Sequence, residues 1–349
     1  MFLRLISLTA CFLFAIFSEA QNNEPHLRNI RQLTHGGDNA EAYFSFDNKK
    51  LVLQSNNPAW GLKCDQIFVL KINEAAADSN YKPIRISKGG RTTCSYFMPG
   101  NKKVIYASTI GADTACPPPV DLRKGGKYLW QIHDSYDILL ANKKGRVLRK
   151  LTNAPGYDAE ATVSPTGDKI VFTSTRSGDL ELWIMDIDGS NQKQITTALG
   201  YDGGAFFSAD GKKLVYRASR PTTEAEINEY KELLKQGLVA PSNMEIFTCN
   251  VDGSDVKQIT NLGKANWAPF FTPAGDRIIF SSNHRSERGY DFQLYTIKTD
   301  GTGLEQITYE SYFNAFPMFS FDGKKLVFSS NRNNKGTRDT NVFIADWVE

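Results

Sequence analysis

A short pattern of alternating apolar and polar residues, ending in threonine or serine, recurs six times along the chain. The six copies end at Thr34, Ser87, Thr152, Thr196, Thr260 and Thr308. A turn residue follows each anchor after 14 or 15 positions, in the order Asn48, Asn101, Gly167, Gly211, Gly275 and Gly323. An apolar strand such as KKLVL comes directly after each turn. Such regular spacing indicates a repeat architecture.

Each repeat predicts a hairpin, because Gly and Asn tolerate the left-handed backbone of a tight turn between alternating strands. A third strand follows, as in LELWIMDIDGS, and its Asp-Gly turn leads into the next anchor strand. Four strands per unit are typical of a propeller blade. The sequence therefore predicts an all-β fold, a six-bladed β-propeller of four-stranded antiparallel blades.

The two ends of the repeat array predict how the ring closes. The array begins with an anchor strand at residues 30–34 and ends with a third-strand segment at residues 341–347. We expect the N-terminal strand to complete the last blade, which removes two exposed sheet edges.

The turns also carry a family resemblance. Ser164-Pro165-Thr166-Gly167 and Ser208-Ala209-Asp210-Gly211, followed by an S-x-R-like strand end and a D-x-D-G turn, resemble the TolB-like or WD40-like (PD40) propeller repeat. The resemblance covers residues 28–349 and leaves out the α/β domain that precedes the propeller in TolB. It implies the fold more than an activity, because related propellers occur in translocation proteins, peptidases and lyases.

The first twenty residues predict a signal peptide. Arg4 provides a positive charge, residues 5–17 are apolar, and Ser18-Glu19-Ala20 forms a small-x-small cleavage site. We therefore expect residues 1–20 to be removed, a propeller over residues 28–349, no transmembrane segment in the mature chain, and a periplasmic or extracellular location. Cys11 lies too early in the apolar run for lipoprotein anchoring.

Charge and cysteine content narrow the partners and the compartment. The net charge is +3, and no basic run suggests a nucleic-acid partner. Export permits disulfides, and Cys64, Cys94 and Cys116 are the candidates for a bridge. Cys249 takes the repeat position of Met185, so we expect a buried free thiol there.

The loops that enter the innermost strands share one face with the ends of the second strands. Polar and aromatic residues at these places form a candidate ligand-binding site: Glu41, Tyr157, Asp158, Glu160, Arg176, Tyr201, Asp202, Arg220, Asn266, Trp267, His284, Arg285, Asn314 and Arg332. Such groups suit a sugar, a carboxylate or a peptide segment. The structural alternative is that Asp and Arg residues of neighbouring blades pair with each other and complete the repeat.

Two insertions interrupt the repeat. Residues 108–136 combine Cys116-Pro117-Pro118-Pro119 with several aromatic residues, which either cap a ligand or anchor the loop. Residues 221–244 predict one short amphipathic helix in blade four, with a Thr223/Glu226 capping box and a stop at Gly237. We expect this helix to dock on its own propeller rather than on a partner.

The sequence indicates no catalytic residues, no metal site and no cofactor. It has no G-x-S-x-G elbow and four histidines without zinc-site spacing, and the D-x-D-G segments are explained by turns. The first hypothesis is a non-enzymatic module of the cell envelope that binds a protein or peptide. The alternatives are a carbohydrate-binding or lyase-like propeller, whose relatives use histidine-held metals, and a structural platform in a larger complex.

Overall fold

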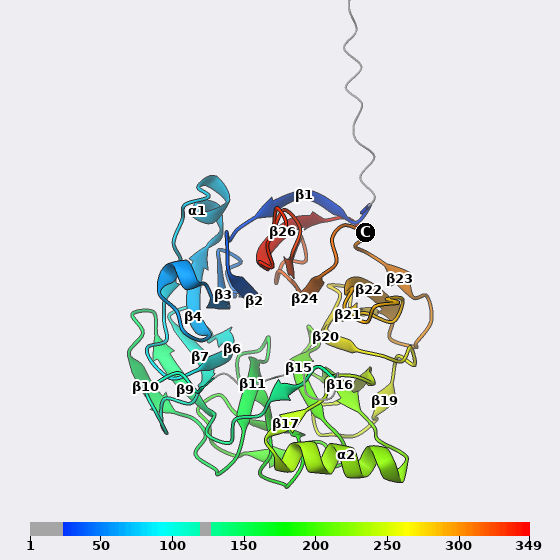
Figure 1. Ribbon diagram of the computed structural model, residues 1–349. Coiled ribbons are helices and arrows are strands. Elements are labelled where there is room, and N and C mark those ends of the chain that lie inside the picture. The colour runs from blue at the N-terminus through cyan, green and yellow to red at the C-terminus, as the bar shows by residue number, and fades with distance from the viewer. Residues whose placement is uncertain (1–23, 119–126) are drawn as a thin grey trace, which may run out of the picture.

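The computed structural model describes residues 24–118 and 127–349. Its strands form six four-stranded antiparallel sheets arranged as blades around a central channel (Figure 1). The predicted six-bladed propeller is therefore confirmed. The predicted signal peptide with Cys11, and residues 119–126 of the blade-two insertion, lie outside the described residues.

Each of the first three blades has four strands, which follow one another from the channel outwards. Blade one contains β2 (Asp38–Phe44), β3 (Lys50–Asn56), β4 (Gln66–Lys71) and β5 (Ile84–Arg85). Blade two contains β6 (Thr92–Phe97), β7 (Lys103–Ser108), β9 (Asp137–Asn142) and β10 (Val147–Lys150). Blade three contains β11 (Asp158–Val163), β12 (Lys169–Ser174), β13 (Glu181–Asp186) and β14 (Lys193–Gln194).

The other three blades repeat this order. Blade four contains β15 (Asp202–Phe207), β16 (Lys213–Ser219), β18 (Met244–Asn250) and β19 (Lys257–Gln258). Blade five contains β20 (Asn266–Phe271), β21 (Arg277–Ser282), β22 (Gln293–Lys298) and β23 (Glu305–Gln306). Blade six contains β24 (Asn314–Phe319), β25 (Lys325–Ser330), β26 (Asn341–Trp347) and β1 (Leu27–Gln32).

The N-terminal strand closes the ring as the repeat predicts. β1 pairs antiparallel with β26, from Leu27 opposite Trp347 to Gln32 opposite Phe343. A buried ion pair strengthens this closure, because the guanidinium nitrogens of Arg332 lie 3.0 and 3.1 Å from the carboxylate oxygens of Glu24. The first described residue of the chain is therefore fixed to its last blade.

The repeated anchor hydroxyl has the same function in all six blades. It accepts a hydrogen bond from a backbone N–H of the third strand, at 2.8–2.9 Å. The six acceptors are Thr34, Ser87, Thr152, Thr196, Thr260 and Thr308. The anchor therefore satisfies a buried backbone donor where the outermost strand ends.

The six turn residues predicted from the repeat all have a left-handed backbone, with φ between 56° at Asn48 and 77° at Gly167.

Two helices interrupt the strands. Helix α2 (Glu224–Lys235) lies between β16 and β18 and has the expected capping box between Thr223 and Glu226. A six-residue helix α1 (Ile72–Ala77) and a 3-10 turn η1 (Pro58–Trp60) in blade one did not follow from the sequence pattern.

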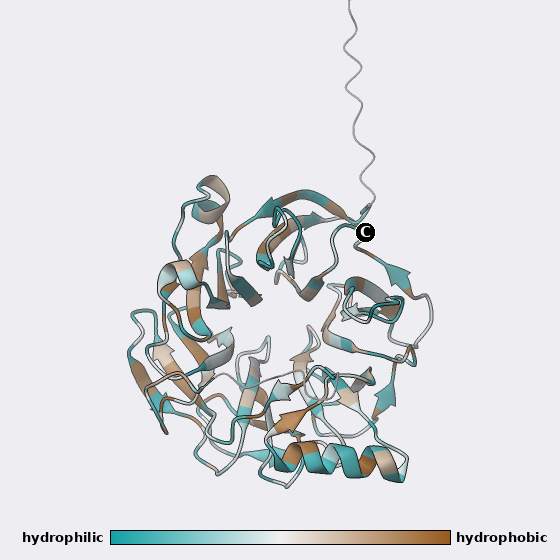
Figure 2. Ribbon diagram, in the orientation of Figure 1, coloured by the Kyte–Doolittle hydropathy of each residue, from teal (hydrophilic) through white to brown (hydrophobic). Residues whose placement is uncertain are grey.

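The core lies between neighbouring blades, where apolar side chains of adjacent sheets pack against each other. Figure 2 shows hydrophobic residues concentrated along the strands, while the loops are mostly polar. Large buried residues include Phe44, Phe97, Phe172, Phe280 and Phe328. Within the described residues, no helix is both long enough and apolar enough to span a membrane.

Candidate functional site: the capped central channel

Every innermost strand contains a bulge at the same level of the channel. At each bulge the register shifts, and one residue adopts a left-handed backbone with φ between 44° and 60°. The six bulge residues are Glu41, Cys94, Glu160, Gly204, Ala268 and Phe316, and all six line a cavity of about 1170 Å³. A bulge re-aims a side chain out of the regular alternation of a strand. The six bulges therefore occupy equivalent positions on the channel wall, but each blade except blades one and three, which both have glutamate, places a different residue type there.

Glu160 is the most fully bonded residue of this ring. Its carboxylate accepts hydrogen bonds from Tyr201 Oη at 2.7 Å, Thr173 Oγ1 at 2.7 Å and the Gly204 N–H at 2.8 Å. Arg217 Nη2 lies 2.5 Å from Glu160 Oε1. Burial alone would raise the pKa of Glu160, but the charge of Arg217 and these hydrogen bonds outweigh it and hold the pKa below its usual value.

Two adjacent glycines make room for this cluster. A Cβ atom at Gly204 would stand 1.9 Å from Arg217 Nη1, and one at Gly203 would stand 2.4 Å from Glu160 Oε2. Gly204 also has a φ of +60°. Both the backbone conformation and the close approach of Arg217 therefore favour glycine at position 204.

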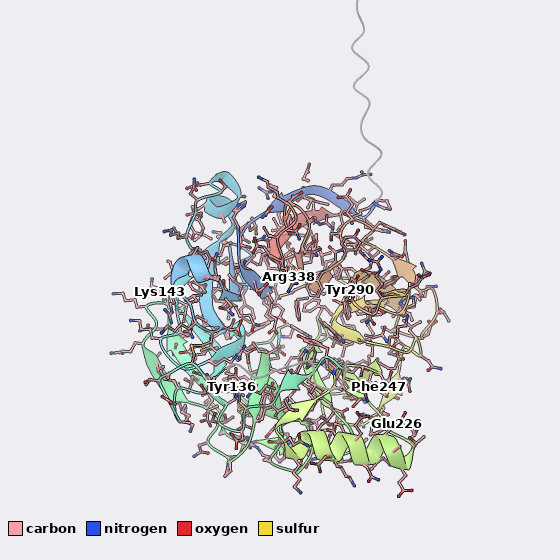
Figure 3. All side chains as sticks on the ribbon, in the orientation of Figure 1. Tyr136, Lys143, Glu226, Phe247, Tyr290 and Arg338 are labelled. Carbon is pink, nitrogen blue, oxygen red and sulfur yellow. A yellow bond between two sulfur atoms is a disulfide. The ribbon has the colours of Figure 1, made fainter. Side chains whose placement is uncertain are left out.

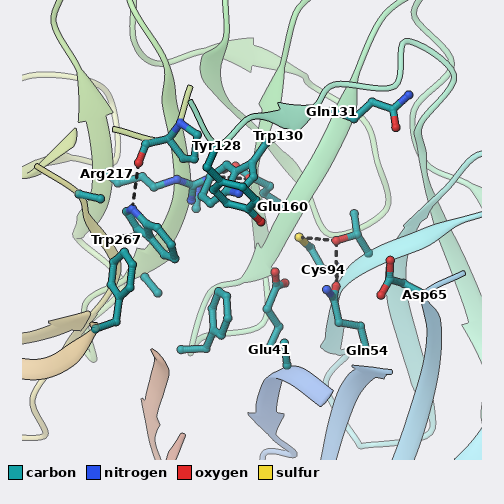
Figure 4. Close-up of a pocket in the computed structure, with 18 of the residues that line it drawn as sticks. Glu41, Gln54, Asp65, Cys94, Tyr128, Trp130, Gln131, Glu160, Arg217 and Trp267 are labelled. Carbon is teal, nitrogen blue, oxygen red and sulfur yellow. Dashed lines mark hydrogen bonds and ion pairs between the residues drawn. The ribbon is translucent and has the colours of Figure 1, made fainter. Parts of the chain in front are cut away.

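Glu41 occupies the equivalent bulge of blade one but has different surroundings. Its carboxyl group contacts the Cys94 thiol, and no lysine or arginine of the described residues forms an ion pair with it. Figure 4 shows the Glu41 side chain pointing from β2 into the cavity, towards the space between Glu160 and Cys94. Burial raises the pKa of Glu41 to about 7, with a further contribution from the negative charge of Glu160.

The two insertions join each other at the mouth of the cavity. Strand β8 (Trp130–Gln131) of the blade-two insertion pairs with β17 (Leu238–Val239), which follows α2 in blade four. The Ile132 N–H donates to the Gly237 carbonyl at 2.7 Å, and Lys127 forms an ion pair with Glu229 on α2. We call residues 127–136, which line the cavity mouth, the cap; β17 and α2 hold it in place. The predicted helix thus docks on its own molecule.

Trp130 anchors the cap to the channel wall. Its ring lies 5.2 Å from the Trp267 ring and 6.4 Å from the Tyr201 ring, both edge to face, and the Arg217 guanidinium lies 5.1 Å from its centre. A disulfide between Cys64 and Cys116 ties the start of the insertion to blade one, while Cys94 and the buried Cys249 are free thiols.

Five residues of the sequence-predicted site line the cavity: Glu41, Tyr157, Glu160, Tyr201 and Trp267. The other nine lie outside its lining: Asp158, Arg176, Asp202, Arg220, Asn266, His284, Arg285, Asn314 and Arg332. Glu41 and Glu160 line the cavity as bulge residues, whereas Tyr157, Tyr201 and Trp267 line it from positions before the bulges of their blades.

Most of these nine residues are engaged in bonds within their own blade. Arg176 Nη2 lies 2.8 Å from both carboxylate oxygens of Asp158. Arg220 pairs with Asp202 in the same way. In blade six an asparagine takes the place of the aspartate, and Arg332 donates a hydrogen bond to Asn314 at 3.1 Å. The pairs lie within one blade and not between neighbouring blades as the structural alternative proposed.

Blade five has uncharged hydrogen bonds in place of this ion pair. Ser282 Oγ donates to Asn266 at 2.6 Å and contacts His284 Nδ1 at 2.9 Å. Arg285 bonds to Gln306 on the exposed side of the blade. None of these residues points its polar atoms towards the channel cavity.

Sequence reasoning did not identify Arg217, which lines the cavity. The repeat did contain a signal. Position 217 pairs with the residue just before the bulge, where the other five blades have Gln54, Ala107, Thr173, Ser281 and Ser329. Arg217 is the one charged residue at this repeat position, and it lies opposite Gly203 and Gly204. An arginine beside two glycines, where the other blades have neutral residues, could have indicated a blade-specific contact.

Comparison of this chain with known protein families supports the repeat pattern. Residues 128–237 match the family model described as PD40, the TolB beta propeller domain. Residues 128–237 are therefore similar to the repeats of that domain. The prediction made from the Ser-Pro-Thr-Gly turn is thereby confirmed.

Solved structures show the same fold. A putative TolB from Agrobacterium tumefaciens superposes with a TM-score of 0.59 at 18% identity, covering 92% of this chain and 97% of the other. TolB from Acinetobacter baumannii gives 0.53 at 16% identity, covering 89% of this chain and 63% of the other. An oligogalacturonate lyase in complex with manganese gives 0.50 at 13% identity, covering 92% and 93%. At these identities the likeness concerns the fold alone.

A manganese site does not fit this propeller. Within residues 24–118 and 127–349, no three His, Cys, Asp or Glu side chains converge in a way that could hold a metal ion. In the cavity itself, Glu160 is engaged with Arg217 and Tyr201. We therefore assign no chemistry to a metal in this channel.

Proposed function

We propose that this chain is an exported, non-enzymatic TolB-like propeller that binds an envelope protein by taking a peptide segment into its capped channel. The capped cavity of about 1170 Å³ is the observation that supports this function most directly. Preformed, mostly apolar cavities with a few polar groups are typical of binding sites. The cap adds exposed Tyr128 at the cavity lining, and Tyr290 is exposed at the same cavity from blade five.

The position of Tyr290 supports access from solvent. Figure 3 shows Tyr290 and Arg338 near the centre of the ring, while Glu226 on α2 and Lys143 lie at its periphery. Tyr290 is 54% exposed and Tyr128 is 50% exposed. Aromatic residues of this kind contribute large contact areas when a partner covers them.

The aromatic residues on which the carbohydrate hypothesis depended are covered. The Trp267 ring lies 4.1 Å from the Phe292 ring and also contacts Trp130, so its faces do not form an open platform for a sugar. The Arg217 guanidinium lies over the Tyr201 ring at 4.8 Å, and Tyr136 packs against Tyr157. This packing favours a peptide over a stacked sugar ring.

A carbohydrate-binding or lyase-like propeller is the second candidate. It is supported by the fold likeness to the oligogalacturonate lyase and by the exposed rings of Tyr128 and Tyr290. The two candidates differ in what they bind and in whether the ligand is changed.

Export is part of the proposal and rests on residues 1–20 together with the Cys64–Cys116 disulfide. Disulfides persist in oxidising compartments such as the periplasm. Cell fractionation followed by N-terminal sequencing tests it: an exported mature chain beginning at Gln21 supports export, and a cytoplasmic chain that retains Met1 contradicts it.

Selection from a displayed peptide library on the purified mature protein tests the binding function. Selected peptides are then measured by fluorescence anisotropy on the wild type, on Tyr128→Ala/Tyr290→Ala and on Tyr312→Ala. Tyr312 is a matched control because it is 67% exposed on a neighbouring loop but does not line the cavity. We expect roughly tenfold weaker binding in the double variant and unchanged binding in Tyr312→Ala.

Three results would contradict the proposal. Peptides that bind the double variant as tightly as the wild type place the site outside the channel. An acidic or neutral glycan that binds in a screen where no peptide binds supports the carbohydrate candidate. Turnover of a glycan or peptide, measured by mass spectrometry, makes the protein an enzyme.

A further inference from the structure

The two carboxylates of the bulge ring differ in their partners. Glu160 has an arginine, a tyrosine, a threonine and a backbone N–H as bonding partners, which satisfy both of its oxygens. Glu41 stands at the equivalent bulge of another blade, and among the described side chains only the Cys94 thiol forms a hydrogen bond with it. Glu41 is partly buried, and a carboxylate that has lost part of its hydration is normally paired with a cation.

Among residues 24–118 and 127–349, no lysine or arginine forms an ion pair with Glu41. Arg217 is the positive charge that acts on Glu41, but it is already paired with Glu160. The other charged groups that act on Glu41 are Glu160 and Asp65, both negative. Asp65 is paired with Arg91 at 2.8 Å. The negative charges of Glu160 and Asp65 therefore favour a positive group beside Glu41.

Aromatic rings surround the same part of the cavity. Tyr43, two residues after Glu41 on β2, contacts the Phe206 ring edge to face at 5.2 Å and the Tyr96 ring at 5.9 Å. Tyr43 and Phe206 both line the cavity. These rings are only 3–6% exposed and form an apolar wall, beside which the Glu41 carboxylate can accept a charge-assisted hydrogen bond from an ammonium group.

We propose that Glu41 binds a primary ammonium group of the ligand, carried either by a lysine side chain or by the free N-terminus of the peptide segment. The inference rests on the proposed peptide-binding function and specifies the chemistry of its ligand. Glu160 and Arg217 form a neutral wall opposite, and Glu41 carries the one carboxylate of the bulge ring that is left for the ligand.

Small peptides that differ in one charge test this directly. The compounds are N-acetyl-lysine N-methylamide, glycylglycine N-methylamide and the uncharged Nα,Nε-diacetyl-lysine N-methylamide. Binding to the mature protein is measured by NMR titration on the wild type, Glu41→Gln and Glu287→Gln. Glu287 is exposed and does not line the cavity, so its variant removes the same charge without changing the channel.

We expect one of the two ammonium compounds to bind the wild type roughly tenfold more tightly than the diacetyl compound, as expected of a charge-assisted hydrogen bond. This preference should disappear in Glu41→Gln and remain in Glu287→Gln. Preference for the lysine derivative identifies a side-chain ammonium, and preference for the glycylglycine derivative identifies an N-terminus.

Equal binding of charged and acetylated compounds, no binding of either ammonium compound, or a preference that persists in Glu41→Gln would overturn the inference. The peptide-binding function is judged separately, because the library selection and the Tyr128→Ala/Tyr290→Ala variant do not depend on an ammonium group. Selected peptides that bind without any amine would leave the function standing while this inference fails.

Discussion

The Arg217 guanidinium and the Glu160 carboxylate form an ion pair of 2.5 Å across 57 residues of sequence, between blades three and four. Their side chains are 7% and 10% exposed. The pair fixes the wall of the channel, positions Tyr201 through a further hydrogen bond of 2.6 Å, and supports Trp130 of the cap. It connects the structural core of the propeller to its candidate binding site.

Arg217→Met should destabilise the protein by about 3 to 5 kcal/mol, because Glu160 would then be a buried charge without a partner. The double variant Glu160→Gln/Arg217→Met should recover part of this loss. Lys150→Met is the control, since Lys150 pairs with Asp137 at 2.6 Å but its side chain is 45% exposed, and it should cost about 0 to 1 kcal/mol. Urea unfolding measures all three; equal losses for Arg217→Met and Lys150→Met would contradict the buried pair.

Gly204→Ala should destabilise the protein more than Gly263→Ala. Both glycines have a left-handed backbone, at φ +60° and +70°, so both variants lose about 1 to 2 kcal/mol through backbone strain. Only the Cβ at position 204 collides with Arg217, which adds about 1 to 3 kcal/mol. Thermal and urea unfolding compare the two variants. Identical losses would mean that Arg217 moves aside without cost.

Thr196→Val tests the anchor hydroxyl of the repeat. The Thr196 hydroxyl accepts from the Leu182 N–H at 2.8 Å and donates to Glu181, so its removal leaves a buried backbone donor unsatisfied. We expect a loss of about 1 to 3 kcal/mol in the free energy of unfolding. Thr197→Val changes the neighbouring exposed threonine and should have little effect. If both variants were equally stable, the anchor would not stabilise its blade.

Cys64→Ser/Cys116→Ser should lower stability and loosen the cap. The bridge closes a loop with a sequence separation of 52 residues, and its loss should cost about 2 to 4 kcal/mol. The Ile132 amide, bonded to Gly237, should then exchange faster with solvent, as hydrogen exchange would show. Cys94→Ser is the control because Cys94 is a free thiol. Unchanged exchange at Ile132 would show that the β8–β17 pairing holds the cap without the bridge.

Glu41 should make the protein less stable as the pH rises from about 4.5 to about 7. Burial raises the pKa of Glu41 from 4.5 to about 7, so in this window the folded protein binds the proton that the unfolded chain has released. The stabilising contribution is complete below pH 4.5 and is lost as the pH passes about 7. The change in the free energy of unfolding should be on the order of 2 kcal/mol. One pKa unit corresponds to about 1.4 kcal/mol, and contact of the Glu41 side chain with solvent reduces the full effect.

Urea unfolding of the wild type and Glu41→Gln at several pH values from 4 to 8 measures this contribution. The difference between the two proteins should grow with pH across the window, in favour of Glu41→Gln. A difference that does not depend on pH would show that Glu41 has an ordinary pKa, and it would also weaken the case for an ammonium ligand.

The periodic features of the fold follow from local sequence. The six anchors, the left-handed turns at Asn48 and Gly167, and the capping box of α2 depend on neighbouring residues, so the blade pattern and the closing strand could be predicted. The short helix α1 could not be, because its six residues Ile72–Ala77 lack a capping side chain.

The roles of the residues in the candidate site could be predicted from the sequence only in part. Glu41 and Glu160 lie where the repeat places them, but their roles separate only through Arg217, which approaches Glu160 from the next blade. Asp158 and Arg176 belonged to the same predicted face, yet they bond to each other behind the channel.

The number of blades, their hairpins and the residue at each repeat position follow from the amino-acid sequence, because alternation and turn chemistry act over a few neighbouring residues. The pairing of Trp130 with Val239, the bond between Cys64 and Cys116, and the position of Glu41 at the cavity with no ion pair to a described cation depend on the fold as a whole. These contacts join segments tens of residues apart, and they form because ring closure brings together surfaces that no local pattern relates.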